Sequence, residues 1–539
     1  MSHSGVQESV DVVDSVRIRR ALISVFDKSG LLALAKTLTE HEVELFSTGG
    51  TERYLREHGF DVHSVTDLTK FPEMLDGRIK TLHPMVHGGL LYRRDLASHR
   101  AQISEHGIPP IDLLVVNLYP FEETVAKPGA TRAEIVEQID IGGPAMLRSA
   151  AKNFNGVALL TSPEQYTNFI AELDASAGGT TLSTRFALAA EAFANVARYD
   201  AAISNYFGQL GIAGTEEMQP HLDLSLDRVQ PLRYGENPHQ SAALYGEDFA
   251  KIFQQLWGKE LSYNNILDLS ASTLLIAEFM SSPIATVAII KHMNPCGVAQ
   301  GSDVLDAFDR AFRADPESPF GGIVVMNRPL TALLAERLNG FFSEVIVAPS
   351  FESDALTILQ KKKDRRLVRF SPEAVQASPG RSLELRSVLG GVLVQQTDVP
   401  LLGSGPITSV TKRPVSDAEM EGLLFAWKCV KHIKSNAIVY CGLEDGFART
   451  LGIGAGQTSR VESSRLAVKR AAQFGHSLAG SFVASDAFFP FADGLTEAIV
   501  AGAIAVIQPG GSIRDTEVIA EAEKHGISMV LTGMRHFRH

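Results

Sequence analysis

The segment "VRIRRALISVFDKSGLLALAKTLTEHEVELFST" (residues 16–48) decides the fold of the first part of the chain. Apolar residues dominate 16–26 and again 43–48, which is typical of strands buried inside a sheet. Residues 31–42 between them have a helical pattern. A buried strand, a helix and a second buried strand form the unit of a parallel sheet covered by helices. The segment therefore predicts an α/β domain.

The same alternation continues for about 200 residues, the span of one or two typical domains. Further buried strands are expected at 111–119 and 156–162, and a long helix at 181–207 closes the block. Two motifs, Thr131-x-x-Glu134 and Ser162-Pro163-x-Gln165, have the pattern of capping boxes and predict helix starts.

Composition limits the class of protein. The 539 residues are 45% hydrophobic, enough for several cores and two to four domains, and the net charge of −12 argues against generic nucleic-acid binding. The three cysteines, Cys296, Cys429 and Cys441, form no Cys-x-x-Cys pair, so reduced thiols and a cytoplasmic protein are expected. The apolar run 498–511 is too short to span a membrane and predicts a buried helix or strand entering a glycine turn.

Changes in composition and hydrophobic pattern along the chain predict the domain boundaries. Residues 1–16 lack the features of a signal peptide and are expected to be a disordered lead, followed by a domain at 17–210. The polar, Pro/Gly-punctuated stretch 211–231 predicts a linker. Residues 232–539 exceed one typical core and predict two subdomains, about 232–385 and 386–539. Lys431-His432 follows Lys291-His292 at a spacing of 140 (431 minus 291), which suggests a weak internal repeat.

The motif "STGGT" (47–51) is the clearest candidate site in the first domain. Its glycines permit a tight turn and close approach, and a helix begins immediately afterwards, so free N–H groups favour an anion such as phosphate. Lys28 and "GRIKT" (77–81) add positive charge. A plain strand-to-helix turn with a hydroxyl cap is the alternative interpretation.

Further polar residues follow predicted strands of the same sheet, whose carboxyl ends should form one crevice. Taken alone, Tyr119 is as well explained as a core hydroxyl, and Asp140 as a helix cap. The polar residues expected at or near this crevice are Ser24, Asn117, Tyr119, Asp140 to Gly143, and Lys152.

The stretch "AIIKHMNPCGVAQG" (288–301) is the clearest candidate in the second region. A zinc deaminase would need Pro-Cys-x-x-Cys and a preceding His-x-Glu, but Ala299 replaces the second cysteine and the His-x-Glu is missing, which disfavours catalytic zinc. Acid–base chemistry is the second hypothesis, with His292 accepting a proton from an amine and Lys291 stabilising an oxyanion. A bare Lys-His pair is also typical of an exposed loop, so the choice depends on other motifs.

Six further polar motifs supply that context. Their arginines suit an anion and their phenylalanines suit a flat ring, although each residue alone is also typical of a surface or a core. The motifs are "LRYGENPHQ" (232–240), "SPFGG" (318–322), "KSNA" (434–437), "GIGAGQTSR" (452–460), "SDAFFPF" (485–491) and "MRHFRH" (534–539).

Taken in this order, the motifs from about Arg17 to His539 closely resemble the bifunctional purine biosynthesis family, in which phosphoribosylaminoimidazolecarboxamide (AICAR) formyltransferase is fused to inosine monophosphate (IMP) cyclohydrolase. The resemblance implies a methylglyoxal-synthase-like parallel-sheet domain, then two cytidine-deaminase-like α/β subdomains without catalytic zinc. It also implies a homodimer with transferase sites across the interface, and no nucleic-acid or membrane partner.

The implied chemistry has two steps. Formyl passes from 10-formyltetrahydrofolate, a co-substrate, to the 5-amino group of AICAR, giving formyl-AICAR (FAICAR), which closes to IMP with loss of water. No tightly bound cofactor and no metal is implied. A non-catalytic purine-nucleotide sensor on the same fold is the rival hypothesis, and a zinc deaminase is the third.

The resemblance also implies residue roles. For ring closure, Lys80, Tyr119, Asp140 and Lys152 would surround the reacting groups, and the nucleotide would be held by Ser24, Lys28, Ser47, Thr48, Gly49, Gly50, Thr51, Arg78, Thr81, Asn117, Ile141, Gly142 and Gly143. For formyl transfer, His292 would be the base, Lys291 its polarising partner and Asn436 a holder of the acceptor. Arg233, Tyr234, Asn265, Arg460, Phe488, Arg535 and His539 would bind nucleotide, and Phe320, Gly321, Pro490, Phe491 and Asp493 would bind folate.

Overall fold

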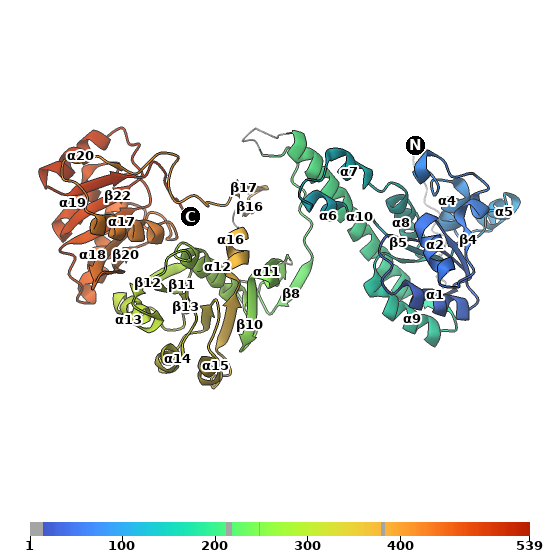
Figure 1. Cartoon of the computed structure of the whole chain (residues 1–539), viewed down its shortest axis with the longest axis horizontal. Helices are drawn as coiled ribbons and strands as arrows, with labels where there is room; N and C mark the ends of the chain where they lie inside the picture. The colour runs from blue at the N-terminus through green and yellow to red at the C-terminus, as the bar shows by residue number, and fades with distance from the viewer. Residues whose placement is uncertain (1–13, 212–217, 247, 379–382) are drawn as a thin grey trace. The chain divides into compact units, whose positions relative to one another are not determined.

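The computed structural model describes residues 14–211, 218–246, 248–378 and 383–539, and the chain divides into two compact units, 1–225 and 226–539 (Figure 1). The second unit includes β8 (Arg228–Leu232), which pairs with β9 (Ala242–Tyr245), so the predicted linker 211–231 contains the start of that unit. The disordered lead predicted for 1–16 extends too far, because β1 (Ser15–Arg17) pairs with β7 (Gly179–Thr181). Residues 1–13 lie outside the described residues.

The first unit is built on a five-stranded parallel sheet, as its sequence pattern predicts. The strand order is β4-β3-β2-β5-β6, with β2 at Arg20–Val25, β3 at Glu44–Ser47, β4 at His63–Ser64, β5 at Leu113–Asn117 and β6 at Ala158–Leu160. Apolar side chains from both faces form two cores. One lies under α1 (Leu31–Glu40) and α9 (Tyr166–Ala175), and the other lies under α4 (Pro84–Leu91), α8 (Gly142–Lys152) and α10 (Leu182–Gly211).

Both predicted capping boxes are present. Thr131 and Glu134 start α7 (Arg132–Glu137), and Ser162 and Gln165 start a 3-10 turn, η2 (Pro163–Gln165), that leads into α9. The remaining helices of this unit are α2 (Gly49–Glu57), α3 (Val65–Thr69), η1 (Leu75–Gly77), α5 (Ala97–Glu105) and α6 (Phe121–Ala126).

The second unit is a duplicated structure on one 12-stranded sheet. The first repeat runs α12 (Tyr263–Ala277), β11 (Ala285–Lys291), β12 (Asn294–Gly301), α13 (Val304–Ala314), β13 (Ile323–Met326), α14 (Ala332–Asn339), β14 (Val345–Ala348), α15 (Ser353–Leu359) and β15 (Arg366–Phe370). The second has the same order: α17 (Asp417–Val430), β19 (Ile438–Glu444), β20 (Phe447–Gly454), α18 (Arg460–Gln473), β21 (Ser481–Ser485), α19 (Ala492–Ala501), β22 (Ala503–Gln508), α20 (Asp515–Lys524) and β23 (Ser528–Leu531). The repeats meet where β12 pairs with β20, with Ala299 opposite Arg449.

Smaller elements extend this sheet or connect its halves. They are α11 (Asp248–Ile252), β10 (Phe253–Trp257), α16 (Pro372–Ala377), the hairpin β16 (Leu383–Val388) and β17 (Gly391–Gln396), and β18 (Thr408–Ser409). The predicted subdomain boundary at 385/386 falls inside β16. Within the described ranges, no helix is both long and apolar enough to cross a membrane.

The internal repeat exists, but the spacing predicted from Lys-His pairs is wrong. The hairpin β19–β20 follows β11–β12 at a spacing of 153 (438 minus 285), so Lys291-His292 corresponds to Glu444-Asp445. Lys431 and His432 instead follow α17, where they contact Glu278. The apolar run 498–511 is the end of α19 followed by β22, joined at the left-handed Gly502.

Candidate active sites

The loop 47–51 lies at the carboxyl end of the parallel sheet, as predicted. Ser47 and Thr51 donate hydrogen bonds to the carbonyls of Ile23 and Val25, and the hydroxyls of Ser24 and Thr48 lie 2.9 Å apart. These contacts fix the loop against β2. Helix α2 begins at Gly49, and Thr48, its N-cap, makes no side-chain cap hydrogen bond. The hydroxyl-cap alternative therefore lacks its defining contact, while the helix N-terminus retains N–H groups suited to an anion.

Asn117 and Lys28 shape the neighbouring loop. The Asn117 side chain accepts the N–H of Asp27 at 3.0 Å and donates to the Asp27 carbonyl at 2.8 Å. Lys28 donates to the Phe26 carbonyl and lies 5.9 Å from the centre of the Tyr54 ring. Asn117 therefore orders the loop after β2, which positions Lys28.

Asp140, Tyr119 and Lys80 form one interacting cluster in this unit. Asp140 accepts the N–H of Gly143 at 2.8 Å, and Tyr199 accepts the N–H of Asp140 at 2.7 Å. Burial raises the pKa of Asp140, against the lowering effect of the Gly143 and Gly142 N–H groups and the Lys80 charge. Burial, followed by the Asp140 charge, raises the pKa of Tyr119, so its phenol stays protonated at neutral pH. The cluster thus combines a carboxylate, a phenol donor and a cation.

The remaining predicted residues of this site surround the cluster. The amino group of Lys80 lies close to Gly49, since a Cβ atom added to Gly49 would be 3.1 Å from it. The Thr81 hydroxyl lies close to Gly142, where an added Cβ atom would collide with it. Arg78 pairs with Glu137 on the surface, and the Ile141 side chain is exposed. The 47–51 loop and the start of α8 therefore approach one another through Lys80 and Thr81.

Lys152 is not brought into this cluster. It ends α8, ten residues after Gly142 and thus about 15 Å along the helix. There it lines a separate cavity of about 530 Å³ with Leu91, Arg148, Ser149, Ala151, Phe154, Phe186, Ala189, Ala190 and Phe193. Its catalytic role stays a prediction.

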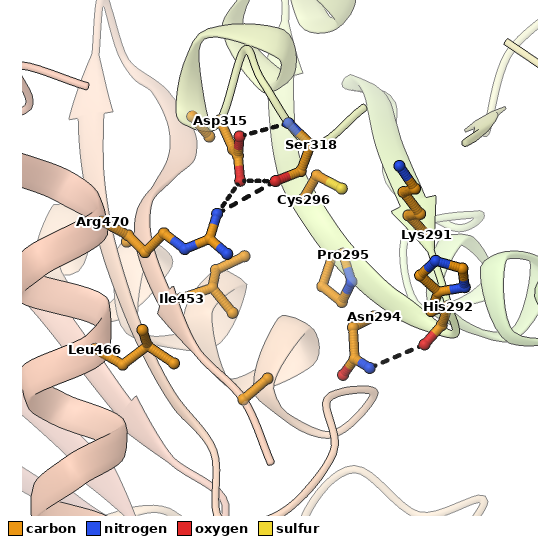
Figure 2. A pocket seen from close by; sticks show the side chains of 13 residues that line it. Lys291, His292, Asn294, Pro295, Cys296, Asp315, Ser318, Ile453, Leu466 and Arg470 are labelled. Atoms are coloured by element: carbon orange, nitrogen blue, oxygen red, sulfur yellow. Dashed lines mark hydrogen bonds and ion pairs between the residues drawn. The ribbon is translucent and has the colours of Figure 1, made fainter. Parts of the chain in front are cut away.

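A cavity of about 430 Å³ opens where the two repeats of the second unit meet (Figure 2). Lys291 ends β11 and His292 lies in the following turn, on the opposite side of the cavity from Leu466 and Arg470 of α18 (Figure 2). Arg470 pairs with Asp315 at 2.6 Å and so joins the repeats. The lining residues are Lys291, His292, Asn294, Pro295, Cys296, Ala314, Asp315, Ser318, Gly452, Ile453, Ala455, Leu466 and Arg470.

Cys296 lies in this wall, where the zinc hypothesis would need a thiolate. Burial, followed by the Asp315 charge, raises the pKa of Cys296 to about 12, so the thiol is protonated at neutral pH. Among the described residues, three or more His, Cys, Asp or Glu side chains are nowhere grouped as a metal site would require.

Asn436 and Arg460 belong to one buried network. Arg460 donates to Asn436 at 2.9 Å, to the Phe488 carbonyl at 3.1 Å and to Asp486 at 2.6 Å. Only 7% of Arg460 is exposed. Arg460 therefore holds the Asn436 side chain and the Phe488 backbone, and its expected contact with the nucleotide stays a prediction. Its ion partner Asp486 is not among the residues predicted for the site, although it lies inside the motif "SDAFFPF".

The other predicted residues form separate groups in the single chain. Arg233 and Tyr234 line a cavity of about 220 Å³ with Lys259, Glu260, Leu261 and Ser262. Asn265 forms the capping box of α12 and donates to Glu344. The rest occupy several surfaces: Phe320 and the left-handed Gly321 precede β13, Pro490, Phe491 and Asp493 flank the start of α19, and Arg535 and His539 lie in the C-terminal segment.

Comparisons with known proteins agree with this architecture. A model of the MGS-like domain matches residues 30–145, and a model of the AICARFT/IMPCHase bienzyme matches residues 150–470. "Bifunctional purine biosynthesis protein PurH" of Chloroflexus aurantiacus is 54% identical over 529 residues, which cover 98% of this chain and 100% of that protein. The proteins of the same name from Magnetococcus marinus and Roseobacter denitrificans are 51% and 50% identical, covering 97% and 98% of this chain and 100% of each relative.

A parallel-sheet unit of the MGS-like type followed by a duplicated α/β unit defines a two-domain bienzyme. The chain belongs to the AICARFT/IMPCHase bienzyme family. It is a bifunctional enzyme of purine biosynthesis with AICAR formyltransferase and IMP cyclohydrolase activities, and the family, fold class and activities predicted from the motifs are confirmed. The deaminase likeness of the two repeats and the residue roles stay predictions.

Proposed function

We propose that the second unit transfers the formyl group from 10-formyltetrahydrofolate and that the first unit closes the ring. The observation that carries the first assignment is the pair Lys291 and His292 at the rim of the inter-repeat cavity. The second assignment depends on the Asp140 cluster beside the anion-suited loop 47–51.

In formyl transfer, the 5-amino nitrogen of AICAR attacks the formyl carbon, and the His292 imidazole accepts the proton that this nitrogen loses. The Lys291 ammonium stabilises the negative oxygen of the tetrahedral intermediate. The bond from the formyl carbon to N10 of the folate then breaks, and N10 takes up a proton, releasing tetrahydrofolate and FAICAR. Asn436, which Arg460 holds at 2.9 Å, would bind the acceptor.

In ring closure, the carboxamide nitrogen of FAICAR attacks the formyl carbon and forms the new N–C bond. The bond from that carbon to its oxygen then breaks, and the oxygen leaves as water with two protons, one from the carboxamide nitrogen and one from the formamide nitrogen. Asp140 as a carboxylate accepts a proton from the carboxamide nitrogen, while the protonated Tyr119 phenol and Lys80 stabilise the oxygen that departs. The nucleotide phosphate would lie at the N-terminus of α2, where the helix dipole and N–H groups favour an anion.

We further propose that the enzyme is a cytoplasmic homodimer with transferase sites across the interface. The groups around Arg233, Phe320 and Phe491 are separate in one chain, so a partner could bring them together. The hairpin β16–β17 supports this proposal, because it exposes Leu385, Leu389 and Leu393, and an isolated hairpin is only marginally stable. The free thiols Cys296, Cys429 and Cys441 suit a reducing compartment.

The test supplies purified enzyme with AICAR and 10-formyltetrahydrofolate and follows IMP by chromatography. We expect His292→Ala to abolish formyl transfer while FAICAR, supplied directly, still closes to IMP. Nucleotide binding without turnover would instead favour a sensor. Loss of both reactions in the correctly folded variant would contradict the division between units.

A further inference from the structure

The turn that carries His292 has an unfavourable composition. His292 and Met293 connect β11 to β12, and both have left-handed backbones, with φ of 53° and 62°. Two consecutive left-handed residues between antiparallel strands form a type I′ turn, in which Asn, Asp and Gly predominate. A side chain with a Cβ costs about 1–2 kcal/mol per residue in this region. The turn therefore needs support from elsewhere in the protein.

The second repeat contains the same turn with a favourable composition. Asp445 and Gly446 connect β19 to β20, and their φ values are 54° and 82°. Both flanking strands follow those of the first repeat at a spacing of 153 (438 minus 285 and 447 minus 294). The two repeats thus share a backbone conformation, but only the second uses residues that adopt it readily.

Asp268 supplies the support in the first repeat. Asp268 lies in α12, which packs on β11. Its carboxylate accepts a hydrogen bond from the N–H of Met293 at 2.7 Å. The His292 charge and the His292 N–H also stabilise the carboxylate. When α12 and α17 are aligned on their N-caps, Ser262 and Ser416, the residue corresponding to Asp268 is Gly422. At this helix position, the repeat with the unfavourable turn thus has an aspartate, and the repeat with the favourable turn has a glycine.

We propose that Asp268 is a positioning residue for formyl transfer, whose carboxylate holds the His292–Met293 turn and thereby orients the His292 imidazole. The proposal rests on the proposed role of His292 as the base. It assigns Asp268 no contact with substrate.

The test compares D268A with D268N. We expect D268A to lower kcat for formyl transfer by about 10- to 100-fold, as for a displaced general base, with KM for both substrates nearly unchanged. D268N should recover most of this loss, because its amide oxygen still accepts the N–H of Met293. D268A/M293G should recover part of it, because glycine adopts a positive φ without steric cost. Ring closure of FAICAR should be unaffected in all three.

Asp303 offers a matched control. It accepts the N–H groups of Leu305 and Asp306 at 2.8 and 2.9 Å, beyond the end of β12 opposite the turn. In thermal unfolding, D303A should lose about as much stability as D268A does, but it should retain formyl transfer. Equal losses of formyl transfer in D303A and D268A would overturn the proposal.

Three further results would also overturn the role of Asp268: wild-type kcat in D268A, equal impairment of D268N and D268A, or no recovery in D268A/M293G. H292A, measured in parallel, separates this proposal from the proposed function. Full formyl transfer in H292A would remove the role of His292 itself. An inactive H292A beside a fully active D268A would overturn only the role of Asp268.

Discussion

The ammonium group of Lys291 donates a hydrogen bond to the backbone carbonyl of Phe320 over 2.9 Å. This contact ties the end of β11 to the loop before β13. The Phe320 ring remains 64% exposed and packs against Phe342, with 4.8 Å between the ring centroids. An exposed ring anchored beside the proposed catalytic lysine is suited to stack on the flat pterin of the folate.

Phe320→Ala should therefore weaken folate binding selectively. We expect KM for 10-formyltetrahydrofolate to rise about tenfold, which corresponds to about 1.4 kcal/mol of lost stacking, with KM for AICAR unchanged. The substitution retains the carbonyl that Lys291 binds. Phe186, which is 60% exposed in the first unit, provides the control, and Phe186→Ala should leave both KM values unchanged. An unaltered folate KM in the Phe320 variant would refute the stacking role.

Gly50→Ala should test the phosphate site proposed for the loop 47–51. Gly50 lacks the positive φ of Gly49, and a Cβ built on it meets nothing within 4 Å, so packing within the chain does not require glycine there. We expect KM for FAICAR to rise at least about tenfold if the phosphate approaches this backbone. The melting temperature should not fall, because alanine favours helix over glycine. Gly405→Ala, at an equally open glycine of the second unit, should change neither quantity.

The sequence predicted the first unit more fully than the second for a physical reason. Continuous apolar strands separated by helices follow from local patterns, and β2, β3, β5 and β6 lie where those patterns indicate. The duplication in the second unit depends on long-range strand pairing. Lys291 and Lys431 each precede a histidine, but they occupy different positions in the two repeats. The matching Lys-His dipeptides therefore predicted the wrong repeat spacing.

The site predictions divide in the same way. Residue types near predicted strands suggested the loop 47–51 and Asp140, whose roles stay predictions, whereas the contacts of the buried Asp486 and the half-buried Asp268 join distant segments and follow only from the fold. Arg460 illustrates the limit. Its charge suggested an anion ligand, but its burial and its ion pair with Asp486 are properties of the folded chain.

The pH dependence of ring closure should report on Asp140. Burial raises its pKa, and the Lys80 charge opposes that rise. The proposed mechanism requires the Asp140 carboxylate, so the rate of ring closure should fall as pH decreases through this raised pKa. Lys80→Met removes the positive charge, which should raise the pKa further and shift the acidic limb of the residual activity to higher pH. Initial rates of FAICAR closure between about pH 4 and pH 9 would measure this shift. The control is Lys36→Met, at an exposed lysine of α1 that pairs with Glu40, and it should leave the acidic limb of the pH–rate profile unshifted. An unshifted acidic limb in the Lys80 variant would contradict an effect of the Lys80 charge on the pKa of Asp140.

Glu278 should contribute stability that disappears in acid. Its carboxylate accepts a hydrogen bond from Lys431 at 2.8 Å, and the Lys431 side chain is only 4% exposed. Burial acts to raise the pKa of Glu278, but the hydrogen bond from His432 and the charge and hydrogen bond of Lys431 dominate and lower it to about 2. Burial lowers the pKa of His432, so Lys431 is the positive charge that faces Glu278 at neutral pH. Because the folded pKa lies below the ordinary value of 4.5, this stabilisation is complete above pH 4.5 and is lost as pH falls toward 2.

Glu278→Gln should therefore lower the free energy of unfolding at neutral pH by about 3–5 kcal/mol, because it leaves the Lys431 charge buried without its partner. Urea unfolding of wild type and variant should show this difference shrinking at about pH 3, where Glu278 of the unfolded chain is mostly protonated. Glu523→Gln breaks the ion pair with Lys412, whose side chain is 87% exposed, and should leave the free energy of unfolding nearly unchanged at either pH. A Glu278 difference of equal size at both pH values would mean that packing, and not charge, accounts for the loss.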